Sequence, residues 1–426
     1  MLKHMRWSAF LAVLVLVLAA CDTGGDASTG PSTAGSGAAG GSAQETCDAD
    51  EFGCVQIAEG DPIVLGTALV ITGPDASLGL DSQYGAQVAV TLRGEVLGHE
   101  VELNNQDDGC SADGGTSAAN LLRSLPEIVA VIGTSCSSAG VPAAQILSEA
   151  GILLVSPSNT APSLTDPATH EEFYARTAHN DKIQGAAMAQ FACDELQVAT
   201  AATVHDGSPY AEQLQQVFVD EFEAICGGTT TAQEAVTPEQ DDFASLLSSV
   251  ATSNDGAAPD FFYYPIFTAA GALLTQQSAS TAGMEDTILA GADGLFNPDF
   301  LAAAGDAAEN MYLSGPDLAF AGDFYESQFK PEYATVSGQE EPISVFHAHS
   351  YDAVNMLLNA IEASAIQEGG TTYIPRTGLK DAFFAITGHE GITGTLACDE
   401  NGDCADAKIS VSQVQGGEYV RIWPEE

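Results

Sequence analysis

The sequence predicts an α/β protein built from doubly wound parallel sheets in two lobes, and three observations support this prediction. Short apolar, β-rich segments alternate with helical segments along most of the 426 residues. The composition, with 45% hydrophobic residues, 43 Gly and 18 Pro, is typical of a folded chain with a sizeable core. Regular strand–helix alternation produces parallel sheets covered by helices, and the chain is too long for one such core.

Individual strands and helices follow from local pattern. Strands are predicted where short apolar or β-branched runs are bounded by turn residues, and helices where apolar residues recur at the helical period. The predicted strands are residues 62–71, 100–105, 128–133, 152–156, 199–205, 261–264 and 287–290. The predicted helices are residues 82–93, 116–125, 141–150, 182–196, 211–224 and 268–277.

The N-terminal segment has the pattern of an export signal with a lipid-attachment site. Lys3 and Arg6 precede the apolar run 10–20, which is about half the ~20 residues that a membrane-spanning helix requires. The run ends in Leu18-Ala-Ala-Cys21, which resembles the processing box of bacterial lipoproteins, where the cysteine thiol receives the lipid. We expect a signal peptide at residues 1–20 and lipidation at Cys21. An ordinary signal peptide with an accidental cysteine is the alternative.

The next segments are expected to tether the folded part. Residues 21–46 consist mostly of Gly, Ser, Ala and Thr, so they are expected to form a flexible linker. Residues 47–60 are expected to be a separate segment that contains a disulfide. The membrane would then be contacted through the N-terminal lipid only.

The remaining eight cysteines indicate disulfides, because their number is even and the chain has an export signal. Close spacing favours Cys47 with Cys54 and Cys398 with Cys404, although eight cysteines allow on the order of a hundred pairings. A metal site is the alternative interpretation, and no CxxC motif or His–Cys cluster supports it. We therefore expect no metal.

The charge balance excludes one class of partner. With 59 acidic and 11 basic residues, the formal net charge is −48. Binding of nucleic acid requires clustered Lys and Arg, so a nucleic-acid partner is excluded. The carboxylates are spread along the chain, which indicates a solvated surface repelled from anionic lipid. Adaptation to a salty habitat is an alternative cause.

Two hydroxyl-rich turns follow successive predicted strands. Gly133–Ser138 ends the strand 128–133, and Ser156–Pro162 ends the strand 152–156. In open α/β sheets, ligands bind beyond the carboxyl ends of the strands, where helix N-termini favour anions such as a carboxylate. One such turn is more often a structural cap, but two together favour a ligand site.

Further short motifs extend from about Pro62 to the end of the chain. They are Thr72-Gly-Pro74, Asn105–Cys110, Gly133–Ser138, Ser156–Thr160, Arg176-Thr177, Asp181–Gly185, His205-Asp206 with Tyr210, Phe262–Tyr264, Gly291–Gly294, Tyr351–Val354 and Asp399–Asp403. In order and spacing they resemble the periplasmic-binding-protein family of branched-chain amino-acid transporters (the type I, leucine/isoleucine/valine-binding fold). The resemblance implies two lobes joined by three hinge crossovers. Lobe one would comprise residues 61–179 and 315–395, and lobe two residues 180–314 and 396–426.

The resemblance also implies which residues contact the ligand. Ser137 would hold a ligand carboxylate at a helix N-terminus, where the helix dipole favours an anion. Ser158 would contribute its carbonyl, and Thr160 its hydroxyl and backbone, to the ligand ammonium and carboxylate. Tyr210 would cover the ligand from the second lobe, and Asp293 would pair with the ammonium.

Three positions depart from the family pattern. Leu78 stands where amino-acid-binding members often carry an aromatic ring, and Phe267 where a tyrosine is usual. Asp293 is one methylene shorter than the Glu of the best-known members. The ligand side chain that the site prefers therefore stays open.

The resemblance implies one disulfide, and elimination leaves a second. The family pattern implies that Cys110 pairs with Cys136. Elimination then leaves Cys193 with Cys226, a pair that the family does not dictate and that would join two neighbouring helices of the second lobe.

The resemblance implies a monomeric, extracytoplasmic solute-binding protein without cofactor or catalysis. It would deliver a small ligand to an ABC transporter permease, and the favoured ligand is an amino acid. An amide, urea or small carboxylate ligand, or a sensory role, is the alternative.

A hydrolase is disfavoured because the turn at Ser137 lacks the closing Gly of a nucleophile elbow. His347 and His349 are interpreted as packing or surface residues at a helix start. Residues 399–403 are interpreted as a turn, because a calcium loop would need a Glu at position twelve.

Overall fold

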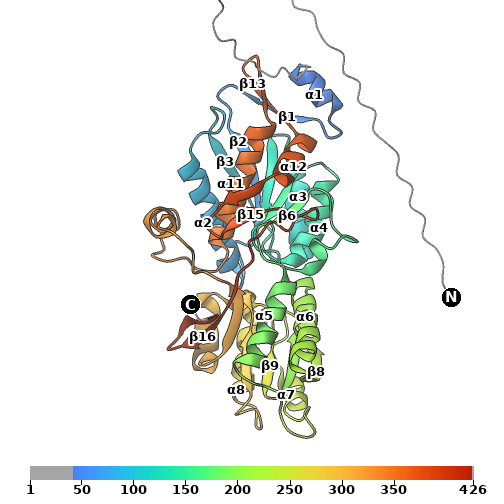
Figure 1. Ribbon diagram of the computed structural model, residues 1–426, viewed down its shortest axis with the longest axis vertical. Helices are drawn as coiled ribbons and strands as arrows, with labels where there is room; N and C mark the ends of the chain where they lie inside the picture. The colour runs from blue at the N-terminus through green and yellow to red at the C-terminus, as the bar shows by residue number, and fades with distance from the viewer. Residues whose placement is uncertain (1–41, 425–426) are drawn as a thin grey trace, which may run out of the picture. The chain divides into compact units, whose positions relative to one another are not determined.

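The structure is a computed structural model that describes residues 42–424. Two lobes, each built around its own sheet, make up this part of the chain (Figure 1). The expected signal peptide, the lipidation site Cys21 and residues 21–41 of the expected linker lie outside the described residues. None of the helices described is long and apolar enough to cross a membrane.

The first lobe contains a five-stranded parallel sheet in the order β3-β2-β4-β5-β6. Its strands are β2 (Ile63–Leu69), β3 (Val101–Asp107), β4 (Ile128–Gly133), β5 (Leu154–Ser156) and β6 (Tyr174–Arg176). Its helices are α2 (Ala76–Arg93), α3 (Ala112–Arg123), α4 (Ser137–Ser148), α10 (Lys330–Ser337), α11 (His347–Ser364) and α12 (Arg376–Phe384). Alternate residues of β4 pack into two separate cores, with Ala130 and Ile132 in one and Val131 in the other, so both faces of the sheet are covered.

The second lobe contains a seven-stranded sheet in the order β17-β16-β11-β10-β9-β7-β8. Its parallel strands are β7 (Thr200–His205), β8 (Thr229–Ala235), β9 (Phe261–Tyr263), β10 (Ile288–Gly291) and β11 (Tyr312–Pro316). The strands β16 (Ile409–Gln415) and β17 (Glu418–Trp423) are antiparallel. Its helices are α5 (Asp181–Asp194), α6 (Pro209–Cys226), α7 (Ala244–Val250), α8 (Thr268–Ala279) and α9 (Pro298–Ala304).

Smaller elements complete the first lobe. The helix α1 (Ala43–Ala49) precedes a three-stranded sheet of β1 (Cys54–Ala58), β13 (Thr371–Pro375) and β12 (Ile366–Glu368). The strands β14 (Thr387–Glu390) and β15 (Thr395–Ala397) form a separate antiparallel pair.

All the predicted strands form, but several helices begin earlier than expected. The helix α2 begins at Ala76 instead of residue 82, because its first turns pack on the end of β2. A Cβ atom at Gly79 would lie 1.9 Å from the carbonyl oxygen of Val70, so only glycine permits this close approach. Because glycine has a low helix propensity, the local sequence does not indicate a helix at this point, and tertiary packing stabilises the helix instead.

The expected linker ends earlier than predicted, because residues 43–46 belong to α1. The Ser42 hydroxyl accepts a hydrogen bond from the Glu45 backbone N–H, and the Glu45 carboxylate accepts one from the Ser42 N–H. This capping box starts a helix in a sequence whose composition alone suggests a flexible segment.

The passages between the lobes also differ in detail from the expected boundaries. Strand β11 continues to Pro316, past the expected passage at residues 314 and 315. Leu396 and Cys404 pack in a core of the first lobe, and the chain returns to the second sheet only at β16. A long-range core contact decides this boundary, and local sequence carries no signal for it.

Within residues 42–424, four disulfides are present, and they join the four expected pairs. Cys47 is bonded to Cys54 and Cys398 to Cys404, each across a short loop. Cys110 is bonded to Cys136, and Cys193 to Cys226. The last pair links α5 to α6, as expected.

A buried carboxylate joins α2 to α11 within the first lobe. Asp81 is fully buried and accepts hydrogen bonds from the backbone N–H groups of Phe346 (3.0 Å) and His347 (2.8 Å). It also accepts one from the Tyr333 hydroxyl at 2.8 Å, and the His347 ring lies 3.1 Å from it. His347 and His349 are both buried, and the bonds of His347 are structural.

Replacement of Asp81 tests the contribution of these hydrogen bonds to stability. Asp81→Ala leaves two backbone N–H groups and a buried hydroxyl without acceptors, so we expect the free energy of unfolding to fall by about 3–5 kcal/mol. Urea denaturation measures this change. Glu223→Ala, at an exposed position of α6, is the control and should change stability by less than about 0.5 kcal/mol. Equal, small losses in both variants would contradict the structural role of Asp81.

Candidate functional site

One small cavity lies between the lobes. It is lined by Leu78, Ser135, Cys136, Ser137, Ser158, Thr160, Tyr210, Phe267, Asp293, Gly294 and Phe346. All seven residues named from the sequence resemblance are among these eleven. Sequence reasoning missed Phe346, which follows no motif, and assigned no ligand role to Ser135, Cys136 and Gly294, although all three lie within motifs it had identified.

The first lobe supplies the hydroxyl groups of this cavity. Ser137 is the first residue of α4, directly beyond β4, and its Oγ accepts a hydrogen bond from the Ala161 N–H at 3.2 Å. The Ser158 hydroxyl donates to the Ser135 carbonyl at 2.9 Å. The Ser137 O–H and the first turn of α4 therefore offer donors to an anionic group in the cavity.

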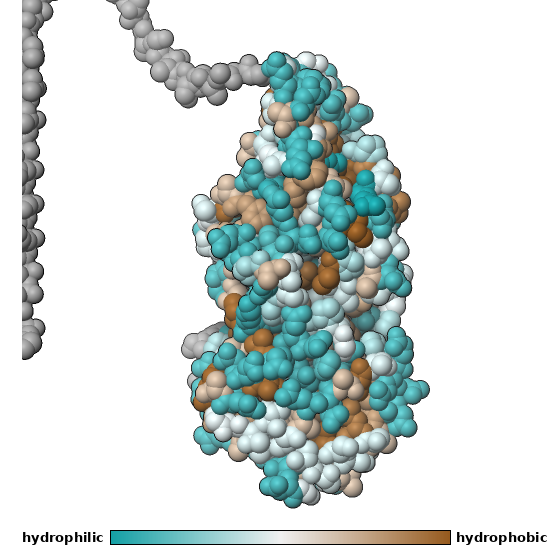
Figure 2. Space-filling view, turned by 90° about the vertical axis from the view of Figure 1, so that its right-hand side faces the viewer, coloured by the Kyte–Doolittle hydropathy of each residue, from teal (hydrophilic) through white to brown (hydrophobic). Residues whose placement is uncertain are grey.

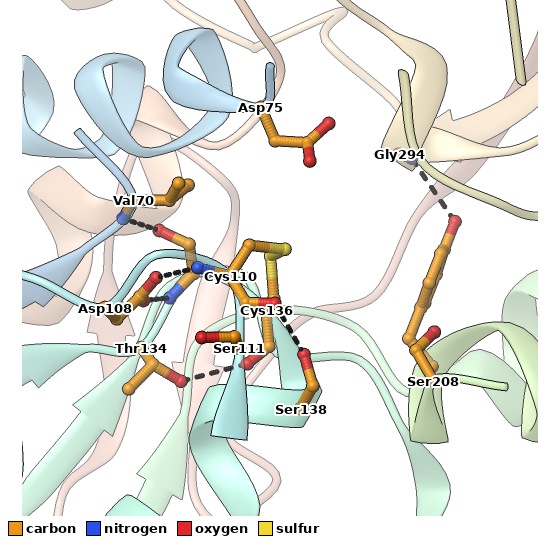
Figure 3. The surroundings of a disulfide bond; sticks show 12 residues. Val70, Asp75, Asp108, Cys110, Ser111, Thr134, Cys136, Ser138, Ser208 and Gly294 are labelled. Atoms are coloured by element: carbon orange, nitrogen blue, oxygen red, sulfur yellow. Dashed lines mark hydrogen bonds between the residues drawn. A yellow bond between two sulfur atoms is a disulfide. The ribbon is translucent and has the colours of Figure 1, made fainter. Parts of the chain in front are cut away.

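Asp108 and a disulfide join the segment after β3 to the turn after β4. The buried Asp108 carboxylate accepts hydrogen bonds from the N–H groups of Ser135 (2.7 Å) and Cys110 (2.8 Å). Figure 3 shows these contacts beside the Cys110–Cys136 bond, with Gly294 of the second lobe opposite. Burial raises the pKa of Asp108 to about 7, because the hydrogen bonds offset only part of the desolvation.

The second lobe supplies the charged group of the cavity. Asp293, only 5% exposed, lies just after β10 and accepts hydrogen bonds from the Tyr210 hydroxyl and the Gln184 side-chain amide, both at 2.8 Å to Oδ1. The Tyr210 oxygen accepts a bond from the Gly294 N–H at 3.2 Å. Burial raises the pKa of Tyr210, and so does the neighbouring Asp293 charge, so the phenol stays a donor. These bonds leave Asp293 Oδ2 free for a cationic group.

Contacts across the lobes close the cavity. The Thr268 N–H of α8 donates to Asp75 at the start of α2 (3.2 Å), and the Ser77 hydroxyl donates to Asp299 of α9 (2.5 Å). The cavity volume is about 10 Å³, which is room for one water molecule. Ligand pockets are usually larger by more than an order of magnitude, so the lobes must separate to admit a small molecule.

Arg176 holds the backbone on both sides of Thr160. This fully buried guanidinium donates to the carbonyls of Asn159 (3.1 Å) and Ala161 (2.9 Å). Its Nε pairs with Asp403 at 2.5 Å, and the Asn180 amide donates to the other Asp403 oxygen at 3.0 Å. The sequence motifs contain Arg176 and Asp403, but nothing local indicates that they meet. Asp403 ends the turn expected at residues 399–403, which lies inside the loop closed by the Cys398–Cys404 disulfide.

The arrangement suits capture of a small molecule that carries both charges. Hydroxyl and helix N–H donors lie on one lobe, and a carboxylate lies on the other. Leu78, Phe267 and Phe346 add apolar surface to the same cavity. Among residues 42–424, no group of three or more metal-ligating side chains occurs.

The fold and the cavity between lobes define a two-lobed α/β binding protein. Residues 62–418 match the model of the periplasmic binding protein family, so the chain belongs to that family. It is therefore an extracytoplasmic solute-binding protein.

Similar proteins agree with this assignment. The chain is 29% identical over 363 residues to the Leu/Ile/Val-binding protein BraC3 of Rhizobium johnstonii, covering 84% of this chain and 93% of that protein. A crystal structure of a leucine-binding protein from Thermotoga maritima superposes with a TM-score of 0.74 at 25% identity, covering 84% and 97% of the two chains. A Streptococcus pneumoniae branched-chain amino-acid binding protein in complex with isoleucine shares the fold, with a TM-score of 0.72 at 21% identity and coverage of 85% and 100%.

Asp403→Asn tests the network around Arg176. The Arg176 charge and the hydrogen bonds lower the pKa of Asp403 and so favour its ionised form, against the opposing effect of burial. The carboxylate therefore stabilises the fold above about pH 4, and this contribution is lost as the pH falls through its lowered pKa. We expect Asp403→Asn to lose about 1–3 kcal/mol of unfolding free energy at pH 7, and the difference from wild type to shrink below about pH 4.

Glu362→Gln is the matched control for this prediction. It removes one partner of the exposed Arg93–Glu362 pair, which should contribute no more than about 1 kcal/mol. Denaturant unfolding at several pH values measures both variants. If the difference in unfolding free energy between Asp403→Asn and wild type stays constant from pH 7 to pH 3, the proposed role of the Asp403 carboxylate is contradicted.

Proposed function

We propose that this protein captures an amino acid with a small aliphatic side chain between its lobes and delivers it to the permease of an ABC transporter. The observation that carries the proposal is the pairing of Asp293 on one lobe with Ser137, at the N-terminus of α4, on the other. A zwitterion brings an ammonium to the first group and a carboxylate to the second. Both charges are then matched in a space from which water is largely excluded.

The binding cycle follows from the placement of these groups. The ligand docks first on the open first lobe, where Ser137, Ser158 and Thr160 hold its polar end. Hinge closure then brings Tyr210, Phe267 and Asp293 over it. The permease recognises the closed form, because only closure brings surfaces of both lobes into one fixed arrangement. No bond of the ligand is made or broken in this cycle.

The apolar wall supports an aliphatic side chain. Leu78 leaves more space than the aromatic ring common at this position, and Phe267 and Phe346 offer no side-chain hydrogen bond. Burial of such surface is worth about 25 cal/mol per Å². The relatives named as Leu/Ile/Val-binding proteins point to the same ligand class.

We propose further that lipid on Cys21 tethers the monomeric protein to the outer face of the membrane. The hydrophilic surface supports this arrangement: Figure 2 shows hydrophilic residues over most of the face in view, with apolar residues scattered among them. With a net charge of −48, the folded part is repelled from anionic lipid and stays free to move on its tether.

Asp293→Ala tests the ligand proposal. A thermal-shift screen of amino acids, amides, urea and small carboxylates first identifies the ligand, because a bound ligand raises the melting temperature. Calorimetry should then show that Asp293→Ala weakens amino-acid binding more than tenfold, since the ammonium loses its counter-charge. Asp306→Ala removes an exposed carboxylate of the same lobe and should bind like wild type. Unchanged affinity of Asp293→Ala would overturn the zwitterion model, and stabilisation by urea or amides alone would identify a different ligand class.

Cys21→Ser tests the tether. The lipid is attached through the Cys21 sulfur, so the variant should appear in the soluble extracytoplasmic fraction while wild type sediments with membranes. Ligand affinity should not change, because the binding cavity is formed entirely by residues 78–346. Membrane association of Cys21→Ser equal to that of wild type would contradict lipidation at this residue.

A further inference from the structure

A second carboxylate, Asp181, is buried beside the ligand cavity and has no hydrogen-bond partner. It is the first residue of α5, directly after the first passage between the lobes, and it is fully buried. Both of its carboxylate oxygens lack a hydrogen-bond partner. A buried ionised carboxylate without partners is very costly, so this group requires an explanation.

The charges around Asp181 make an ionised carboxylate still less favourable. Asp293 lies on the same side of the second lobe and is linked to α5 through Gln184, one turn after Asp181. The hydroxyls of Tyr210 on α6 and Tyr263 on β9 are neighbours of both carboxylates. The charge of Arg176 of β6 favours the ionised form of Asp181, but Arg176 is already bound to Asp403 and two carbonyls.

Two features favour the ionised form, and neither is sufficient. The N-terminus of α5 attracts negative charge, but the Asp181 carboxylate accepts no bond from its N–H groups. Thr160 lies close enough for its hydroxyl to favour the ionised form, yet burial has the larger effect. Burial and the Asp293 charge together raise the pKa of Asp181 well above its usual range.

The ligand is not placed to neutralise Asp181. Thr160 lines the cavity, whereas Asp181 does not. The Asp181 N–H donates to the Thr160 carbonyl at 3.0 Å, so the backbone of Asp181 is also bound to that of Thr160. The ligand ammonium therefore meets Asp293, and Asp181 lies behind the wall of the cavity.

We propose that Asp181 carries a proton in the closed protein and that closure of the lobes around the ligand takes this proton up from solvent. The Asp181–Thr160 contact joins the two lobes, so opening breaks it and admits water to the carboxylate, which then ionises. On closing, the carboxylate binds one proton and becomes a neutral acid beside Asp293. Capture of the ligand is thus coupled to pH, and the part that concerns the ligand rests on the proposed function.

Calorimetry in buffers of different ionisation enthalpy measures the coupling. We expect wild type to take up more protons per bound amino acid than Asp181→Asn, in which a neutral amide replaces the acid, with a difference of at most one proton. Wild-type affinity should weaken as the pH rises above about 4, by at most about tenfold for each pH unit. Affinity of Asp181→Asn should be less dependent on pH and within about threefold of wild type at pH 6. Asp306→Asn, an exposed control, should behave like wild type in both respects.

Equal proton uptake in wild type and Asp181→Asn would overturn the proposal. So would a loss of affinity in Asp181→Asn as large as that of Asp293→Ala, because that result would place the charge of Asp181 on the ligand.

A second experiment needs no ligand and separates this proposal from the proposed function. Because the folded-state pKa of Asp181 is raised, wild type loses stability relative to Asp181→Asn as the pH rises from about 4. We expect Asp181→Asn to unfold at a higher denaturant concentration than wild type at pH 8, and the two midpoints to converge near pH 4. Parallel pH profiles would contradict the proton site. Failure of wild type to bind any amino acid would contradict only the proposed ligand class.

Discussion

The proposed binding site depends on one buried guanidinium. Arg176 ends the last strand of the first sheet and fixes the backbone on both sides of Thr160. Through Asp403 and Asn180 it also joins the first and third passages between the lobes. Five N–H donors in a rigid plane can serve several acceptors at once, which an ammonium on a flexible stem could not do. The loop that would hold the ligand and the segments that bend on opening are therefore parts of one hydrogen-bonded unit.

The two lobes contribute opposite electrostatics to the cavity. The first lobe presents a helix N-terminus and hydroxyl groups, held in place by Asp108 and a disulfide. The second lobe presents the Asp293 carboxylate, whose Oδ1 already accepts hydrogen bonds from Tyr210 and Gln184. Because hydrogen bonds orient each group in advance, little reorganisation is needed when a ligand arrives. In the proposed cycle, closure also buries Asp181, which lies near Asp293 in the same lobe.

Much of the fold could be predicted from sequence, because buried parallel strands are continuous apolar runs, such as residues 128–133. Helix starts were less predictable: α2 and α1 begin where glycine or a linker-like composition hides the helical pattern. The seven proposed contact residues line one cavity because they sit in turns at the carboxyl ends of strands, where the topology brings them together. No local sequence pattern indicates Phe346, because its position depends on a hydrogen bond from its backbone N–H to Asp81, which is distant in the chain.

The α/β class, the family resemblance, the short-loop disulfides and the turns that carry polar groups could be predicted before folding is considered, because each is a local pattern. The position of the third passage between the lobes, the side chains that bind Arg176 and Asp81, and the burial of Asp181 became visible only in the folded chain. Those features depend on contacts between residues distant in the chain. Burial, hydrogen bonding and a shifted pKa are properties of an environment that forms only on folding.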